Sequence, residues 1–107
     1  MKIAKFLLIL VYALTLSLQS LIADDAKMKK GLEIFNETAG CAGCHTLKAA
    51  GSDANIGPNL DTVTLTEEQV KEMVTHGLGV MPAYGEGILT KEEIDIVSFY
   101  VANSAGK

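Results

Sequence analysis

The chain has 107 residues, of which 49% are apolar and 21% are charged, and its formal net charge is −4 at pH 7. This length allows one small domain, and the composition excludes a disordered, low-complexity or collagen-like chain. All the basic residues are lysines. Because phosphate binding depends on clustered cationic side chains, the acidic balance argues against a nucleic-acid partner.

Residues 1–23 have the charge pattern of a secretory signal. Lys2 and Lys5 precede an uncharged, largely apolar run that ends at Ala23, and secretory signals share this order of regions. We expect cleavage after Ala23, which leaves residues 24–107 as the mature domain. A retained transmembrane anchor is the alternative, because the uncharged run approaches the length of a bilayer span. Either outcome predicts export of the remaining chain.

The mature domain is small for a protein without reinforcement. Residues 24–107 number 84 and, without Lys2 and Lys5, carry a formal charge of −6. A single hydrophobic core below about 70–80 residues contributes only a few kcal/mol, so natural domains of this size add disulfides, metals or cofactors. We therefore expect something other than side chains to fill part of the interior.

The first predicted helix of this domain spans residues 25–38. Its apolar residues Met28, Leu32 and Phe35 recur near one helical face, with Ile34 beside them. Gly31 lies within the same pattern. A glycine costs helix stability, so its presence here predicts a close approach of another backbone.

A chemical motif follows this helix, in the sequence Cys41-Ala42-Gly43-Cys44-His45. C-x-x-C-H is the attachment sequence of c-type haem. Two cysteines three residues apart can reach the two vinyl groups on one edge of the porphyrin, and the adjacent histidine then lies under the iron. The motif predicts one haem c, attached through Cys41 and Cys44, with His45 as an axial ligand.

Three other interpretations of the cysteines compete with haem attachment. The cysteines could form a disulfide or a thioredoxin-like redox pair, but the thioredoxin-like fold would need a βαβ pattern, which the sequence lacks. A zinc site formed with His45 and His76 would usually need a second paired motif. A chance occurrence conflicts with export, because an oxidising compartment does not leave free thiols idle.

Two further helices and two long loops complete the domain. Residues 66–76 and 90–103 each begin with a threonine followed three positions later by Gln or Glu, which is the capping-box pattern of a helix start. The intervening segments, 48–64 and 77–89, are rich in glycine, and neither alternates well enough to predict a strand. Long loops in so small a domain are usually functional, so we expect both to wrap the bound group.

The second axial ligand has four candidates: Met28, Met73, His76 and Met81. Met73 falls on the apolar face of its helix, where methionine is usually core filler. His76, in the last helical turn, is expected at the surface. Met81 lies in a glycine-rich loop, and Pro82 fixes the backbone beyond it. A thioether suits low-valent iron, so we predict Met81 as the sixth ligand.

These residues together resemble a small class I cytochrome c. The resemblance rests on the attachment motif at residues 41–45, on Gly57-Pro58-Asn59-Leu60 and on Met81-Pro82-Ala83-Tyr84, in that order, and it covers residues 24–107. It implies an all-α fold, with three main helices, a short turn at the attachment motif and two long loops around covalent haem.

The family resemblance also implies roles for individual residues. Gly31 and Phe35 match one side of the crossing between the first and last helices, and Val97 and Tyr100 match the other. The carbonyl that orients the proximal histidine corresponds to Pro58. Asn59 and Tyr84 are further candidates for hydrogen bonds near the haem or its propionates, and the arginine that often neutralises propionates in relatives is missing here.

The function implied is one-electron transfer rather than catalysis, in the periplasm of a Gram-negative bacterium. The donor would be a dehydrogenase and the acceptor a terminal oxidase or peroxidase. Segments 56–61 and 79–84 also resemble cytochromes that serve sulfite dehydrogenases. We expect a monomer that docks through a small apolar rim made of Ala42, Gly43, Ile56, Val80, Pro82 and Ala83. A haem enzyme or sensor with a labile sixth ligand, and a haem subunit of a larger complex, are the alternatives.

Overall fold

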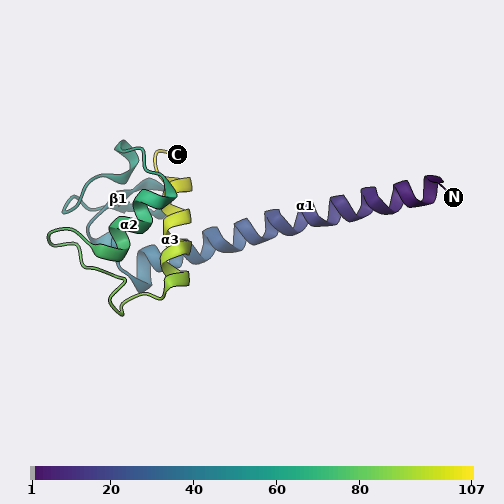
Figure 1. The fold of residues 1–107 in the computed structure, drawn as a ribbon. Helices are drawn as coiled ribbons and strands as arrows, with labels where there is room; N and C mark the ends of the chain where they lie inside the picture. Colours follow the sequence, from purple (N-terminus) through teal and green to yellow (C-terminus); the bar gives the residue numbers. More distant parts are fainter. Residues whose placement is uncertain (1) are drawn as a thin grey trace.

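The computed structural model describes residues 2–107 and shows a small helical body with a long projecting helix (Figure 1). The helices are α1 (Lys2–Glu33), α2 (Glu67–His76) and α3 (Lys91–Ser104), and the strands are β1 (Thr46–Leu47) and β2 (Ser52–Asp53). Shorter helical turns are η1 (Ile34–Thr38, π-helical) and three 3-10 segments, η2 (Cys41–Gly43), η3 (Lys48–Ala50) and η4 (Leu60–Thr62). The predicted all-α fold is confirmed.

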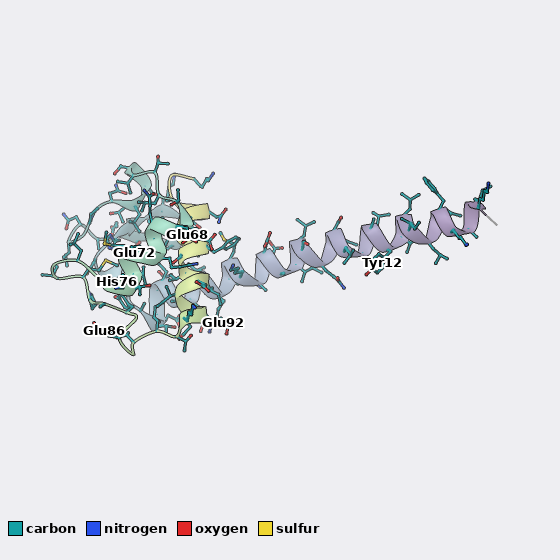
Figure 2. The ribbon with its side chains drawn as sticks, viewed as in Figure 1. Tyr12, Glu68, Glu72, His76, Glu86 and Glu92 are labelled. Carbon is teal, nitrogen blue, oxygen red and sulfur yellow. The ribbon has the colours of Figure 1, made fainter. Side chains whose placement is uncertain are left out.

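Helix α1 begins at Lys2, not near residue 25 as the sequence pattern suggested. No glycine or proline interrupts the chain before Gly31, so the helix continues through the apolar run and into the domain. Its N-terminal part projects from the body, and its side chains, Tyr12 among them, extend away from the rest of the protein (Figure 2). An 18-residue window of α1 has a mean hydropathy of 2.2 and none of it is buried, so the helix is long and apolar enough to cross a membrane.

The C-terminal part of α1 crosses α3 at Gly31, as predicted. Gly31 is buried, and a Cβ atom at this position would overlap the Cβ of Tyr100. The rings of Phe35 and Tyr100 lie 6.0 Å apart beside this crossing, and Val97 is 1% exposed. The absence of a side chain at residue 31 therefore lets the two helices approach closely.

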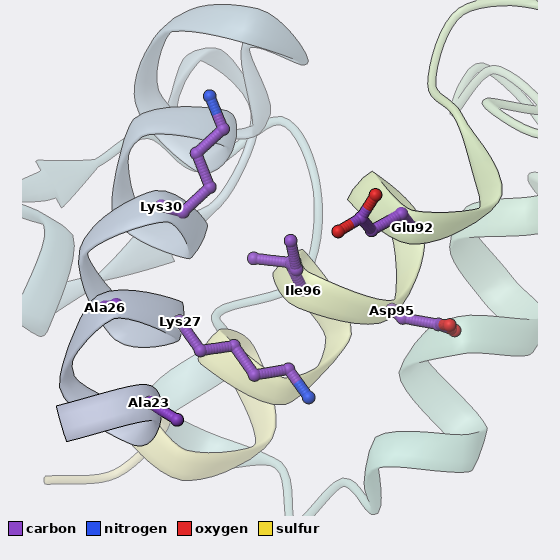
Figure 3. A pocket seen from close by; sticks show the side chains of 7 residues that line it. All are labelled: Ala23, Ala26, Lys27, Lys30, Glu92, Asp95 and Ile96. Atoms are coloured by element: carbon purple, nitrogen blue, oxygen red, sulfur yellow. The ribbon is translucent and has the colours of Figure 1, made fainter. Parts of the chain in front are cut away.

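The outer edge of the α1–α3 interface forms an open pocket (Figure 3). It is lined by Ala23, Ala26, Lys27, Lys30, Glu92, Asp95 and Ile96. Charged side chains of both signs line it, and Lys27 extends over the ring of Phe99 with its Nζ 4.4 Å from the centroid. None of the lining residues belongs to the attachment motif.

The core consists of apolar side chains from η1, β1, α2, α3 and the loop before α3. Its buried members are Ile34, Phe35, Leu47, Val70, Val74, Tyr84, Leu89, Ile94, Val97, Tyr100 and Val101. Two residues predicted on apolar helix faces lie outside this core, because Leu32 is 36% exposed and Met73 is 43% exposed.

Helices α2 and α3 begin where the capping boxes predict. The hydroxyl of Thr66 accepts from the Gln69 amide at 3.1 Å, and the Gln69 side chain accepts from the Thr66 amide at 2.9 Å. Thr90 and Glu93 repeat this exchange at 3.1 and 3.0 Å. Both boxes satisfy amides that the first helical turn leaves unpaired.

A short hairpin corrects the expectation that the domain has no strands. Strands β1 and β2 pair antiparallel, with Thr46 opposite Asp53 and Leu47 opposite Ser52. The Ser52 hydroxyl oxygen also accepts from the Leu47 amide at 3.0 Å. Two-residue strands are too short to produce a recognisable alternation, and Gly51, at φ +72°, supplies the left-handed turn that joins them.

Candidate haem-binding site

The attachment motif forms a tight turn between η1 and the hairpin. Gly40, at φ +70°, starts this turn, and the amides of Cys44 and His45 both donate to the Cys41 carbonyl, at 3.1 and 3.0 Å. The Cys44 side chain is exposed, while Cys41 is partly buried. Burial, with a smaller contribution from the neighbouring Cys44, raises the pKa of the Cys41 thiol to about 11.

His45 is held by the loop that contains Pro58. Its Nδ1 lies 2.7 Å from the Pro58 carbonyl oxygen. A carbonyl only accepts hydrogen bonds, so Nδ1 carries a proton, and in the neutral imidazole Nε2 then keeps its lone pair. Gly57 lies against the ring, since a Cβ there would come within 2.6 Å of the His45 Cε1. The imidazole is therefore fixed in the tautomer that binds a metal through Nε2.

Met81 lies in a tight turn after α2. The Leu78 amide donates to the Met81 carbonyl at 3.1 Å, and the Met81 amide donates to the Leu78 carbonyl at 3.0 Å. Gly79, inside the turn, has φ +58°, and at Gly77 a Cβ would lie 2.5 Å from the Met81 carbonyl oxygen. These glycines allow the turn to form, and the reciprocal hydrogen bonds fix the backbone that carries the Met81 thioether.

His76 lies at the surface, as the sequence predicts. Its side chain is 67% exposed, and its Nε2 is 3.5 Å from a carboxylate oxygen of Glu72. Figure 2 shows both side chains along α2, with Glu68 further along the same helix. Within residues 2–107, no three His, Cys, Asp or Glu side chains come together to hold a metal ion. The alternative zinc site therefore has no support.

Tyr84 and Asn59 make hydrogen bonds within the protein. The Tyr84 hydroxyl donates to the Ala39 carbonyl at 3.0 Å and so links the Met81 loop to the start of the attachment turn. Burial is the main cause that raises the pKa of Tyr84. The Asn59 side-chain oxygen accepts from the Asp61 amide at 2.9 Å, which caps η4. Both residues order the loops of the site.

Asp61 belongs to the same network, although no sequence motif marks it as a site residue. One carboxylate oxygen accepts from the Lys48 amide at 2.8 Å, and the other accepts from the Gly106 amide at 2.9 Å. These hydrogen bonds, that from Gly106 first, hold the pKa of Asp61 below its ordinary value. Its only sequence signal is a position three residues after Pro58, which is also typical of an ordinary turn.

The side chains present fit a covalently bound haem. Two thiols, an imidazole with a free Nε2 and a thioether form the donor set of this cofactor. The apolar side chains of Ile56 and Val80, from the two loops, are 70% and 90% exposed. Cys41, Cys44, His45 and Met81 would hold the group, and these two loops would border it.

Comparison with known proteins agrees with this chemistry. Residues 26–101 match the family model described as cytochrome c oxidase, cbb3-type, subunit III. Cytochrome c6 of Leptolyngbya boryana is 35% identical over 83 residues, which are 72% of this chain and 92% of the relative. Cytochrome c6 of a Picosynechococcus species is 35% identical over 86 residues, covering 70% and 71% of the two chains.

A solved structure is similar in fold as well as in sequence. The c-type cytochrome SorU from Sinorhizobium meliloti superposes with a TM-score of 0.73 at 46% identity, over 78% of this chain and 95% of SorU. The chain therefore belongs to the cytochrome c family, as a small monohaem electron carrier with covalently bound haem c.

Proposed function

We propose that this protein is an exported one-electron carrier whose iron is ligated by His45 and Met81. The observation that carries the proposal is the 2.7 Å hydrogen bond between His45 Nδ1 and the Pro58 carbonyl, which leaves Nε2 free to bind a metal. When bound, haem supplies the Fe(III)/Fe(II) couple. The reduction potential and the access of other molecules to the iron depend on how this chain binds the haem.

His45 and Met81 have opposite influences on the reduction potential. The Pro58 carbonyl makes the imidazole a more basic ligand, which favours the oxidised state. The thioether of Met81 favours the reduced state and raises the potential. With both side chains bound, no position is open for peroxide or oxygen, so the protein carries electrons without catalysing a reaction.

The partners in this proposal are a dehydrogenase donor, such as a sulfite dehydrogenase, and a terminal oxidase or peroxidase acceptor. Support for a sulfite dehydrogenase comes from the resemblance of segments 56–61 and 79–84 to cytochromes that serve such enzymes. The apolar rim is accessible at Ile56 and Val80. A body charge of −6 would complement a basic partner surface around that rim.

The proposed location is the periplasm, with residues 1–23 removed as a signal peptide. The family match begins at residue 26, after the apolar run has ended. The part of α1 that precedes residue 26 contributes no side chain to the buried core. N-terminal sequencing of the exported protein should therefore begin at Asp24, whereas a sequence beginning at Met1 would establish a retained anchor.

The deciding experiment combines extraction and spectroscopy of the exported protein. Acid–acetone treatment should leave haem on the polypeptide, because thioether bonds from Cys41 and Cys44 survive it. The oxidised protein should show the far-red charge-transfer band of methionine-ligated low-spin iron. Free haem in the organic layer, or a high-spin spectrum without that band, would contradict the proposal.

A further inference from the structure

Pro58 cannot anchor its own carbonyl. It has no amide hydrogen to donate, so the position of its oxygen against His45 depends on the residues on either side. On the N-terminal side, the Gly57 amide donates to the Cys44 carbonyl at 2.7 Å. On the C-terminal side, the position of the Pro58 carbonyl depends on how residues 59–61 are held.

Three hydrogen bonds join the segment 44–48 to the segment 57–61 at one constant offset. They pair Cys44 with Gly57, His45 with Pro58, and Lys48 with Asp61, each across 13 residues of sequence. The constant offset means that the two segments run side by side in the same direction. The Lys48–Asp61 bond is therefore the last link of a ladder whose middle link is the His45–Pro58 bond.

Hydrogen bonds within residues 59–62 connect the position of Asp61 to that of Pro58. The Asn59 side chain accepts from the Asp61 amide at 2.9 Å, and its carbonyl accepts from the Thr62 hydroxyl at 2.9 Å and from the Thr62 amide at 3.2 Å. The segment is thus a closed turn. A shift of Asp61 along the ladder would move the Pro58 carbonyl with it.

The second carboxylate oxygen of Asp61 ties the ladder to the end of α3. It accepts from the Gly106 amide at 2.9 Å, two residues beyond the last residue of that helix. Gly106 adopts φ +75°, which directs its amide in a conformation that other residues rarely adopt. One carboxylate thus joins the attachment segment, the proline loop and the C-terminus.

We infer that Asp61 is a positioning residue, which holds the Pro58 carbonyl on His45 Nδ1 and thereby sets the basicity of the imidazole. The inference rests on the proposed role of His45 as a ligand. A weaker Nδ1–H···O=C bond makes imidazole a poorer donor to Fe(III). Loss of the anchor should consequently raise the midpoint potential without changing the ligands.

The test compares holoprotein variants by redox titration. Asp61→Ala should raise the midpoint potential, while Asp61→Asn, which keeps one acceptor oxygen for the Lys48 amide, should remain closer to the unmodified protein. Asp53→Ala is the charge control, because it removes the same charge from an exposed position on β2, and it should cause the smaller shift. An unchanged potential in Asp61→Ala, or equal shifts in the Ala and Asn variants, would overturn the inference.

A second readout separates positioning from general loosening of the fold. In the reduced protein, the proton on His45 Nδ1 should exchange faster with solvent in Asp61→Ala than in Asp53→Ala. If Asp61→Ala yields no holoprotein, a chain ending at Ala105 tests the same anchor by removing the Gly106 amide. That chain should show an upward shift and faster exchange, and unchanged values of both would refute the inference.

Failure of this inference is distinguishable from failure of the proposed function. The charge-transfer band of the unmodified protein tests the ligands, whereas the potentials of the variants test Asp61. An Asp61→Ala protein that keeps the band and an unchanged potential would leave the ligand assignment intact and remove only the role of Asp61.

Discussion

The thioether of Met81 is the side chain on which the proposed redox behaviour most depends. Met81→His should keep the iron six-coordinate but lower its potential, because imidazole donates more strongly and favours Fe(III). Met81→Ala should open the site to water or added ligands and abolish the far-red band. Redox titration and absorption spectra of the oxidised variants check both outcomes.

The other methionines provide the controls for this assignment. Met73→Leu nearly conserves volume at a 43% exposed position, so the free energy of unfolding should change by less than about 1.5 kcal/mol. Met28→Leu should likewise retain the far-red band. Survival of the band in Met81→Ala, with loss of it in either control, would identify a different methionine as the ligand.

The carboxylate of Asp61 should make stability fall in acid. The Gly106 and Lys48 amides lower its pKa in the folded state below the ordinary value of 3.8. A lowered pKa contributes stability above pH 3.8, which is lost as the pH falls through the folded-state pKa. Denaturant unfolding of the holoprotein across this acidic range should show a shallower loss for Asp61→Asn than for the unmodified chain.

At the scale of elements, the crossing of α1 and α3 tolerates no side chain at residue 31. Gly31→Ala would place its methyl on Tyr100, and overpacking of this kind costs about 1–3 kcal/mol. Leu32→Ala on the same helix, at a 36% exposed position, should cost less. Thermal unfolding of the two holoproteins compares them, and equal losses would show that the crossing can spread apart to accept the methyl.

The helices were predictable because their signals are local. The pairs Thr66–Gln69 and Thr90–Glu93 mark helix starts by side-chain chemistry alone, and both boxes form as predicted. The predicted start of the first helix, at residue 25, is wrong, because no glycine or proline interrupts the chain between Lys2 and Gly31 and the helix continues through the apolar run. The proposed cleavage site after Ala23 therefore lies inside a continuous helix.

The parts of the site that the sequence did not reveal depend on long-range contacts. The hairpin of β1 and β2 follows from the turn at Gly51 and from burial of Leu47, and neither gives a periodic pattern. Asp61 acquires its role only when residues 48 and 106 reach it from distant parts of the chain. The attachment motif at residues 41–45 can be predicted from sequence alone. The role of Asp61 cannot, because its hydrogen-bond partners are distant in the chain.

At the scale of the whole molecule, net charge should govern the encounter with a redox partner. Residues 24–107 carry a formal charge of −6, which would attract a basic donor over about 10 Å at 0.1 M ionic strength, and salt would screen this attraction. Stopped-flow reduction by the physiological donor should therefore slow as salt is added. A rate independent of salt would favour docking through the apolar rim around Ile56 and Val80.

The contact between Gly31 and Tyr100 also limits how early the helical body can complete its folding. These residues lie near opposite ends of the segment 24–107, so the contact closes a loop that contains most of that segment. Contacts of such large sequence separation cost chain entropy before packing repays it, and this one cannot form until Tyr100 is available to Gly31. During the proposed export, the chain would remain open until nearly all of it had crossed the membrane, and throughout that interval both cysteines would stay accessible to the machinery that attaches haem.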